Sequence, residues 1–292
     1  MKPFGFIAAK TAAEAIALLA EHGSAARIVA GGTDLLADLK SAPETPGVII
    51  DISRVEELRG IMLTNEGLRF GALATHSDIM ASPLISRMAP ALADAAHSIG
   101  AVQTRNLGTL GGNLVTCVPS MDSGPTLLAL DAHVTVMGRA GQRQMPLGDL
   151  FVGPRKTSLA ADELLVEIVI PTKNLGKPAA FQKFGLRKGQ ALALVNAAAS
   201  FWIERDRFVA PRIALGAVAP TVIRVAKAEA YLTGRAIGAD AMEEAGAIAA
   251  TEATPISDFR ASAGYRRHLV AVLVRRALEI AQTRAKLMEA AA

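Results

Sequence analysis

Cysteine and aromatic residues are scarce in this sequence. Cys117 is the single cysteine among 292 residues, and the aromatic residues make up only 4%. One cysteine excludes an internal disulfide framework, and it excludes an iron–sulfur cluster or structural zinc site built from the cysteines of one chain. We therefore expect a reducing compartment. The 51% of hydrophobic and 20% of charged residues are typical of a globular protein with a sizeable core.

A large charge excess and a long apolar run are also missing. The sequence has 31 basic and 27 acidic residues, a formal net charge of +4, which gives no indication of nucleic-acid binding. No stretch approaches the roughly 20 uninterrupted apolar residues of a membrane span. The segment Met1 to Ile7 contains no apolar core of signal-peptide length. We therefore expect a soluble, cytoplasmic protein with no nucleic-acid partner and no membrane span.

Catalytic and metal-binding patterns are not apparent either. The histidines have no metal-ligand spacing, so we expect ordinary surface or core roles for them: His22, His76, His97, His133 and His268. No Ser/His/Asp or Cys/His arrangement is visible. The sequence therefore predicts no catalytic residue and no metal site in this chain.

The first half of the chain is predicted to contain short strands and helices. A helix starts at the capping box Thr11–Glu14 and ends at Gly23. Apolar runs predict strands at 27–30, 48–51, 68–70 and 162–170, and a hairpin at 133–137 and 142–145. Helices are predicted at 35–40, 75–80 and 84–97, and a glycine-rich loop at 108–113.

The second half reads as strands followed by helices, which predicts an α+β architecture. Strands are expected at 181–186, 194–204 and 212–219, with a polar turn at 205–207. Helices are expected at 224–231, 239–251 and 264–288. The basic residues Arg266, Arg267, Arg275 and Arg276 are interpreted as a solvated helix face, with a partner-binding face as the alternative. The segment 171–178 is a predicted domain boundary.

Two glycine loops are the most informative local features. They are Ala30-Gly31-Gly32-Thr33-Asp34 and Thr109-Leu110-Gly111-Gly112-Asn113. Paired glycines allow backbone amides to approach a ligand closely, and successive amides form a concave site that suits phosphate. Two such loops can hold the two phosphates of a dinucleotide. Each pair can also be a simple tight turn, and neither loop is a Rossmann motif or a P-loop.

These loops resemble a known family. Ala30 to Leu36 is similar to the first FAD diphosphate loop in the medium subunit of molybdenum hydroxylases, the group of xanthine dehydrogenase and carbon monoxide dehydrogenase. Gln103 to Leu114 is similar to the second loop. The segments Arg212–Thr221 and Phe259–Arg266 resemble parts of the family's C-terminal domain. The resemblance therefore covers nearly the whole chain.

The resemblance implies a fold and a division into domains. The expected fold is the FAD-binding fold of p-cresol methylhydroxylase type, with two subdomains, followed by an α+β C-terminal domain. We expect the subdomains at residues 1–57 and 58–175, and the C-terminal domain at 176–292.

The resemblance also implies which residues bind the cofactor, residue by residue. The first loop contributes Ala30, Gly31, Gly32, Thr33, Asp34 and Leu35, and the second contributes Thr109, Leu110, Gly111, Gly112 and Asn113, with Thr116 close behind. Asp122 matches an aspartate that bonds FAD's sugar hydroxyls; its alternative is a helix cap. Leu164 matches a hydrophobic contact near the flavin. Lys183 matches a basic residue at the polar edge of the ring, and its alternative is an ordinary surface lysine.

The implied activity is electron transfer within an oxidoreductase complex. A large molybdopterin subunit oxidises the substrate, a small subunit carries two [2Fe-2S] clusters, and FAD collects the electrons for NAD, a quinone or oxygen. A heterotrimer is expected, and our best prediction within the family is a xanthine dehydrogenase type. Neither loop offers a histidine or cysteine for a covalent flavin bond, and Cys117 nearby is interpreted as a packing residue. We therefore expect noncovalent FAD.

The sequence departs from the family pattern after Lys183. Where relatives often carry an aspartate, the segment Arg187 to Ala193 has none, so no acidic contact is expected there. Two other functions remain open. One is a self-contained flavin-dependent reductase of the same fold, which needs its own acid or base beside the flavin. The other is a structural subunit that has lost its flavin, although paired glycines in both loops argue against it.

Overall fold

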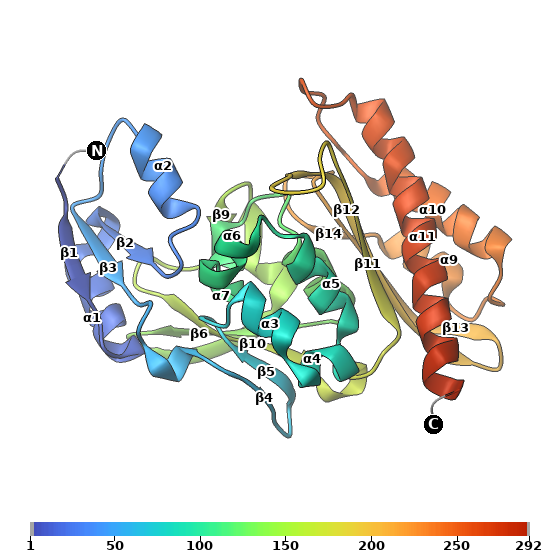
Figure 1. Cartoon of the computed structure of the whole chain (residues 1–292), viewed down its shortest axis with the longest axis horizontal. Helices are drawn as coiled ribbons and strands as arrows, with labels where there is room; N and C mark the ends of the chain where they lie inside the picture. The colour runs from blue at the N-terminus through green and yellow to red at the C-terminus, as the bar shows by residue number, and fades with distance from the viewer. Residues whose placement is uncertain (1–2, 291–292) are drawn as a thin grey trace.

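The computed structural model describes residues 3–290. Three larger sheets follow one another from the N-terminal to the C-terminal end of the molecule, with helices packed beside each (Figure 1). Most strands precede most helices within the C-terminal part, and the N-terminal part mixes both. The predicted α+β class, with an FAD-type N-terminal fold and a C-terminal domain, is confirmed. The predicted limits at residues 1 and 292 lie outside the described residues, and the division at 57/58 and 175/176 stays a prediction.

The N-terminal sheet is small and parallel. Its order is β1-β3-β2, with β1 (Gly5–Ala8), β2 (Ala26–Val29) and β3 (Val48–Asp51), connected by α1 (Ala12–His22) and α2 (Leu35–Ser41). The Thr11 hydroxyl accepts a hydrogen bond from the Glu14 amide and so begins α1, and Gly23, with φ of 51°, ends it. The predicted capping box is half formed, because the Glu14 carboxylate accepts from the Lys10 amide rather than from Thr11.

The central sheet has five antiparallel strands in the order β4-β5-β10-β6-β7. They are β4 (Ile61–Leu63), β5 (Gly67–Gly71), β10 (Leu164–Pro171), β6 (His133–Gly138) and β7 (Gly141–Pro146), and a ribbon of β8 (Phe151–Gly153) and β9 (Lys156–Thr157) follows. Alternate side chains point to opposite faces. Phe70 and Ile168 therefore enter a buried core, while Arg69 and Glu167 form an ion pair on the other face.

Six helices lie between β5 and β6 in the sequence. They are α3 (His76–Ala81), α4 (Pro83–Met88), α5 (Pro90–Ser98), α6 (Val102–Leu107), α7 (Leu110–Thr116) and α8 (Ser123–Ala129). The prediction of one continuous helix over 84–97 is wrong. Pro90 has no amide hydrogen, and its ring clashes with the preceding turn, so α4 ends before Ala89 and α5 begins at Pro90. The predicted loop 108–113 is helical from Leu110, because the Thr109 hydroxyl caps the Gly112 amide.

The four strands of the C-terminal sheet are antiparallel, and they lie side by side in the order in which they occur in the sequence. Its strands are β11 (Ala179–Gly185), β12 (Ala193–Glu204), β13 (Arg207–Gly216) and β14 (Ile223–Arg224), followed by α9 (Ala226–Leu232), α10 (Ala239–Glu252) and α11 (Ala263–Ala290). Strand β13 starts earlier than predicted and ends at Gly216 rather than Ala219. Arg205 and Asp206 both have positive φ, 50° and 57°, and such residues form the two-residue turn that joins hairpin strands. Helix α9 starts after Arg224, which belongs to β14.

One basic residue of α11 is not on a solvated face. The side chain of Arg266 is buried, donates to the Leu194 carbonyl at 2.8 Å and pairs with Asp258 at 2.9 Å. The prediction of a solvated face is therefore wrong for Arg266, which ties α11 to β12. Arg267 and Arg276 are exposed as expected.

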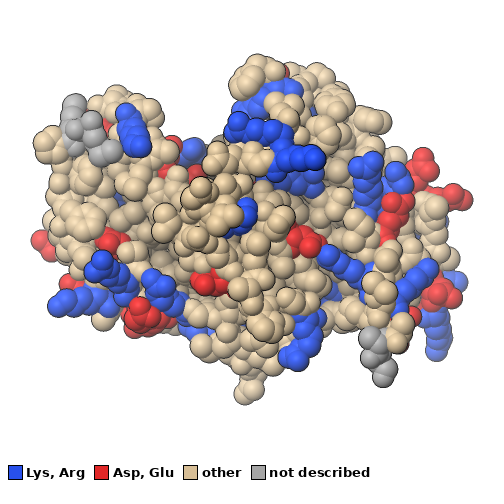
Figure 2. Space-filling view, in the orientation of Figure 1, with Lys and Arg blue, Asp and Glu red and all other residues tan. Residues whose placement is uncertain are grey.

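None of the helices between residues 3 and 290 is long and apolar enough to cross a membrane. Figure 2 shows basic and acidic side chains interspersed over much of one face of the molecule, with a group of basic side chains near its upper edge. This agrees with the small net charge of +4.

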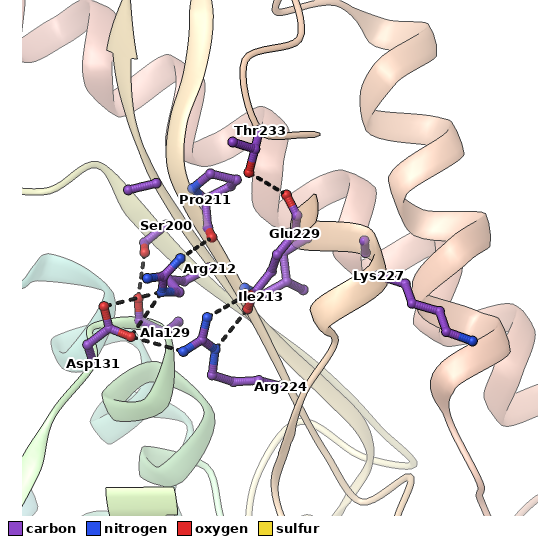
Figure 3. Close-up of polar contacts among 12 residues, drawn as sticks. Ala129, Asp131, Ser200, Pro211, Arg212, Ile213, Arg224, Lys227, Glu229 and Thr233 are labelled. Carbon is purple, nitrogen blue, oxygen red and sulfur yellow. Dashed lines mark hydrogen bonds and ion pairs between the residues drawn. The ribbon is translucent and has the colours of Figure 1, made fainter. Parts of the chain in front are cut away.

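A polar network connects the N-terminal part to the C-terminal sheet (Figure 3). Asp131, just after α8, accepts hydrogen bonds from Arg212 at 3.0 Å and from Arg224 at 3.2 Å. Arg224 also pairs with Glu229 of α9, and the Ser200 hydroxyl donates to the Ala129 carbonyl at 2.6 Å. These contacts hold the end of α8 against β12, β13 and β14, and so position the two parts relative to each other.

Candidate functional site

A cavity of about 460 Å³ lies where the parts of the chain meet. Its wall includes the turn after β2, the segment leading into α7, and residues between β11 and β12. The outline in Figure 2 is notched between the part that contains α2 and the rest of the molecule. The volume is within the range of small-molecule sites, about 300–1,000 Å³.

The first glycine loop leaves backbone donors free in this wall. Strand β2 ends at Val29, Gly32 has φ of 69°, and α2 begins at Leu35. The amides of Gly32, Thr33 and Asp34 donate to no residue within 3–290. All of these residues line the cavity. Unpaired amides at a concave turn suit an acceptor such as a phosphate oxygen.

The second glycine loop is constructed differently. The Leu110 amide donates to the Ala74 carbonyl at 2.8 Å, and the Gly111 amide donates to the Ala72 carbonyl at 2.9 Å. The Gly112 amide donates to the Thr109 hydroxyl at 3.1 Å. Among the amides of the second loop, only that of Thr109 therefore has no acceptor within residues 3–290. This loop supplies side chains and a close backbone surface instead.

The glycines have packing reasons that the sequence did not reveal. A Cβ on Gly31 would lie 1.8 Å from the Leu107 carbonyl oxygen, and one on Gly111 would lie 2.7 Å from Cβ of Ala72. Both residues are small because neighbouring backbone approaches them. Gly31 in particular allows the first loop to lie directly against the segment that leads into the second. The two loops thus share one cavity.

The cavity wall also includes Asp122, which belongs to a buried ion pair. Asp122 accepts from the Lys183 ammonium at 2.5 Å and from the Asn196 amide at 2.8 Å. Lys183 also donates to the Ser98 carbonyl at 3.0 Å. Burial raises the pKa of Asp122, while the charge and hydrogen bond of Lys183 oppose that rise. Asp122 makes no side-chain cap for α8, and Lys183 is not a surface lysine, so both alternatives are wrong.

Most of the predicted site residues meet in this cavity. Those that line it are Ala30, Gly31, Gly32, Thr33, Asp34, Leu35, Thr109, Gly111, Gly112, Asn113, Thr116, Asp122 and Leu164. Leu110 instead points into the hydrophobic core, and Lys183 reaches the cavity only through Asp122. Cys117 is buried, and its thiol lies 3.4 Å from the Gly153 carbonyl. Burial raises the pKa of this thiol, which fits a packing role.

Sequence reasoning missed other parts of the wall. His76 lines the cavity, its side chain is only 2% exposed, and its Nδ1 has no partner. Gln190, Ala191 and Leu192 close one side from the C-terminal domain, where the Gln190 amide donates to the Gly100 carbonyl at 3.0 Å. The only feature of segment 187–193 that stood out in the sequence was its departure from the family pattern. No group of metal-ligating side chains occurs in the described part of the chain.

Two protein-family models match this chain. Residues 2–173 match the model described as the FAD binding domain in molybdopterin dehydrogenase. Residues 179–281 match the model described as the CO dehydrogenase flavoprotein C-terminal domain. The two matches together cover almost the whole chain.

Individual relatives are similar over nearly their full length. The carbon monoxide dehydrogenase medium chain of Hydrogenophaga pseudoflava is 34% identical over 281 residues, covering 96% of this chain and 98% of that one. A xanthine dehydrogenase FAD-binding subunit of Escherichia coli O157:H7 is 33% identical and covers 92% and 93%. A solved structure of the Hydrogenophaga pseudoflava carbon monoxide dehydrogenase superposes with a TM-score of 0.93 at 35% identity, covering 97% and 99%.

Proposed function

Because this chain belongs to the FAD-binding medium subunits of the molybdenum hydroxylase family, we propose that it is the electron-transfer subunit of such an oxidoreductase. It would take electrons from [2Fe-2S] clusters of a small partner subunit. It would pass them on to an acceptor such as NAD, a quinone or oxygen. The observation that carries the proposal is the convergence of both glycine loops and Asp122 on one cavity.

The residues of the cavity fit FAD. The unpaired amides of Gly32, Thr33 and Asp34 form a donor set for a diphosphate, an acceptor-only group. The wall is otherwise rich in aliphatic side chains and glycine backbone, which suits the flat rings of a dinucleotide. No histidine or cysteine of either loop is available for a covalent bond. The cofactor is therefore held noncovalently.

Each wall segment has a proposed role in holding the cofactor. The first loop binds the diphosphate through its amides and the Thr33 hydroxyl. Thr109, Asn113 and Thr116 bind from the opposite side, and Leu164 makes an apolar contact with the flavin. Asp122 is held ready to accept from sugar hydroxyls by Lys183 and Asn196. Leu110 acts from the core, by fixing the start of α7.

When bound, FAD supplies the exchange between single electrons and a hydride pair. The chain's own task is to orient the cofactor and to shape the electrostatics around it. Lys183 places a positive charge behind the wall, paired with Asp122, where it would stabilise negative charge on the reduced flavin. No residue of this cavity is proposed to touch the hydroxylated substrate. That step would belong to a large molybdopterin subunit.

For the substrate of the whole complex, we propose a xanthine dehydrogenase type as the first to test. The support is the similarity to a xanthine dehydrogenase FAD-binding subunit. The carbon monoxide dehydrogenase medium chain is slightly more similar, at 34% identity over 96% of this chain, so it is the direct competitor of that proposal. Xanthine and carbon monoxide should therefore be offered to the purified complex in parallel, with reduction of the flavin band as the readout.

Purification from the native cells tests the subunit role. Affinity-tagged chain should retain two further polypeptides, and metal analysis of the complex should find molybdenum and iron. A chain that purifies alone, carries flavin and oxidises a nicotinamide cofactor on its own would instead be a self-contained reductase.

A further inference from the structure

His76 lies where the two glycine loops meet. It is the first residue of α3, and its amide donates to the Gly108 carbonyl at 3.1 Å. A Cβ placed on Gly108 would lie 3.3 Å from His76 Cδ2 and 3.6 Å from the Thr33 hydroxyl oxygen. The ring edge that carries Cδ2 therefore faces the junction of the loops. Nε2 is bonded to Cδ2 and lies on that same edge.

The buried ring has no internal hydrogen bond. Nδ1 is fully buried without a hydrogen-bond partner. Neither ring nitrogen makes a hydrogen bond to any residue within 3–290. A buried polar group without a partner is rare and calls for an explanation. A buried N–H without an acceptor is rarer than a carbonyl-type acceptor without a donor. We therefore assign the proton to Nε2, so that Nδ1 is only an unused acceptor.

Charge and burial keep this imidazole neutral. Burial lowers the pKa of His76 to about 4, and the nearby charge of Arg105 lowers it further in the same direction. A neutral imidazole has one donor and one acceptor. With the proton on Nε2, the donor belongs to the edge that faces Thr33 and Gly108.

We propose that His76 is a binding residue for the diphosphate of FAD, which it contacts through the Nε2–H donor of its neutral ring. This inference rests on the proposed function. The unpaired amides of Gly32, Thr33 and Asp34 lie in the same wall, so the Nε2–H group joins three backbone donors there, while the Asp34 carboxylate accepts from the Thr33 hydroxyl at 3.4 Å. A sugar hydroxyl both donates and accepts, whereas a phosphate oxygen only accepts, and a set of donors selects the phosphate.

Two substitutions at this position distinguish the loss of the hydrogen-bond donor from a change in the size of the side chain. His76→Leu removes the donor, whereas His76→Gln places an amide N–H at about the reach of Nε2. His97→Leu is the control, because His97 is exposed on α5. The dissociation constant of FAD is measured on the full chain by quenching of flavin fluorescence. Thermal unfolding without FAD checks that each variant is folded.

The expected result is a graded loss of affinity. His76→Leu should weaken FAD binding about tenfold, the effect of one hydrogen bond to a charged group. His76→Gln should stay within about threefold of the wild type, and His97→Leu should not change the dissociation constant. If His76→Leu binds FAD as tightly as the wild type, or if His76→Gln is no better than His76→Leu, the inference is wrong.

Histidine-labelled ¹⁵N NMR of the wild-type chain tests the same contact without a substitution, and it decides the matter if His76→Leu does not fold. The proton should be on Nε2, and its resonance should move downfield when FAD is added. A proton on Nδ1, or an Nε2–H resonance that FAD leaves unchanged, would overturn the inference. A wild-type chain that binds no FAD at all contradicts the proposed function instead.

Discussion

At the scale of single residues, Gly31 sets how closely the two loops approach. The 1.8 Å separation between an added Cβ and the Leu107 carbonyl oxygen predicts that Gly31→Ala forces the loops apart. We expect a loss of roughly 1–3 kcal/mol in unfolding free energy, as for other overpacked sites, together with weaker FAD uptake. Urea denaturation and flavin titration measure the two effects.

Gly264→Ala is the matched control for that change. A Cβ on Gly264 meets no heavy atom within 4 Å, and the residue lies at the start of α11, where alanine is the better helix former. Its stability should be unchanged or slightly higher. Equal stability and equal FAD binding in both variants would show that the loops are not in close contact.

His76 also predicts how stability depends on pH. Its pKa is lowered to about 4 by burial and by Arg105, whereas an unfolded histidine titrates near 6.5. Between these values the unfolded chain binds the proton and the folded chain does not. The stability contributed by the neutral ring is therefore complete above about pH 6.5 and is lost as the pH falls toward 4, by an amount on the order of 3 kcal/mol.

Urea denaturation of the flavin-free chain from pH 7 to 4.5 measures this dependence. Other groups titrate in the same range, so the difference between wild type and His76→Gln is the informative quantity. The substitution should flatten the curve, and His97→Gln should leave it unchanged. A His76→Gln curve parallel to the wild type would contradict a buried neutral imidazole.

At the scale of elements, Arg266 predicts how α11 is fixed to the C-terminal sheet. Its buried guanidinium donates to the Leu194 carbonyl of β12. Arg266→Met should cost roughly 1.5–3 kcal/mol of unfolding free energy, the range for hydrogen bonds made by charged groups. Arg276→Met, on an exposed position of the same helix, should stay within about 0.5 kcal/mol. Thermal or urea unfolding that shows equal effects would exclude this anchoring role.

The elements that the sequence predicted well are those with strong local signals. Strand β3 was predicted with its observed limits, Val48–Asp51, because four residues form an apolar run with turn signals on both sides. Strand β1 was missed because it has glycine and an exposed Phe6 and is held by pairing with β3, a contact distant in sequence. Helix α6 was missed because none of its side chains is buried.

The candidate site, too, was predicted only where local sequence patterns or the family resemblance indicate it. The glycine loops were identified from their motifs and Asp122 from the family resemblance, and they do share one cavity. The wall formed by Gln190, Ala191 and Leu192 depends on how two parts of the chain dock, and no local pattern encodes that. The bonded state of the second loop's amides depends on Ala72 and Ala74, which are far away in sequence.

At the scale of the whole molecule, the network around Asp131 holds the two parts together (Figure 3). Burial raises the pKa of Asp131. The hydrogen bond and charge of Arg212 and the charge of Arg224 act in the opposite direction, and the pKa is lowered overall. A lowered carboxyl pKa gives stability that is present above about pH 4 and is lost as the pH falls through the folded value. The docking of the two parts should therefore weaken in acid.

Asp131→Asn tests this contact while it preserves the shape of the side chain. Asparagine also tolerates the positive φ of 50° at this position. Calorimetry should show a lower unfolding temperature, a loss of roughly 1–3 kcal/mol, and a smaller dependence on pH below about 4. Asp38→Asn removes an exposed pair with Arg155 and should cost no more than about 1 kcal/mol. Equal effects of the two substitutions would contradict a docking role for Asp131.

We propose above all that this chain holds one FAD in the cavity between its two glycine loops. The most direct test is to express the full chain, record its visible absorption spectrum, denature it, and quantify the released chromophore by chromatography. The spectrum should show flavin bands, and denaturation should release close to one FAD per chain without breaking a covalent bond. A colourless chain that takes up no added FAD, either alone or within its purified complex, would contradict it.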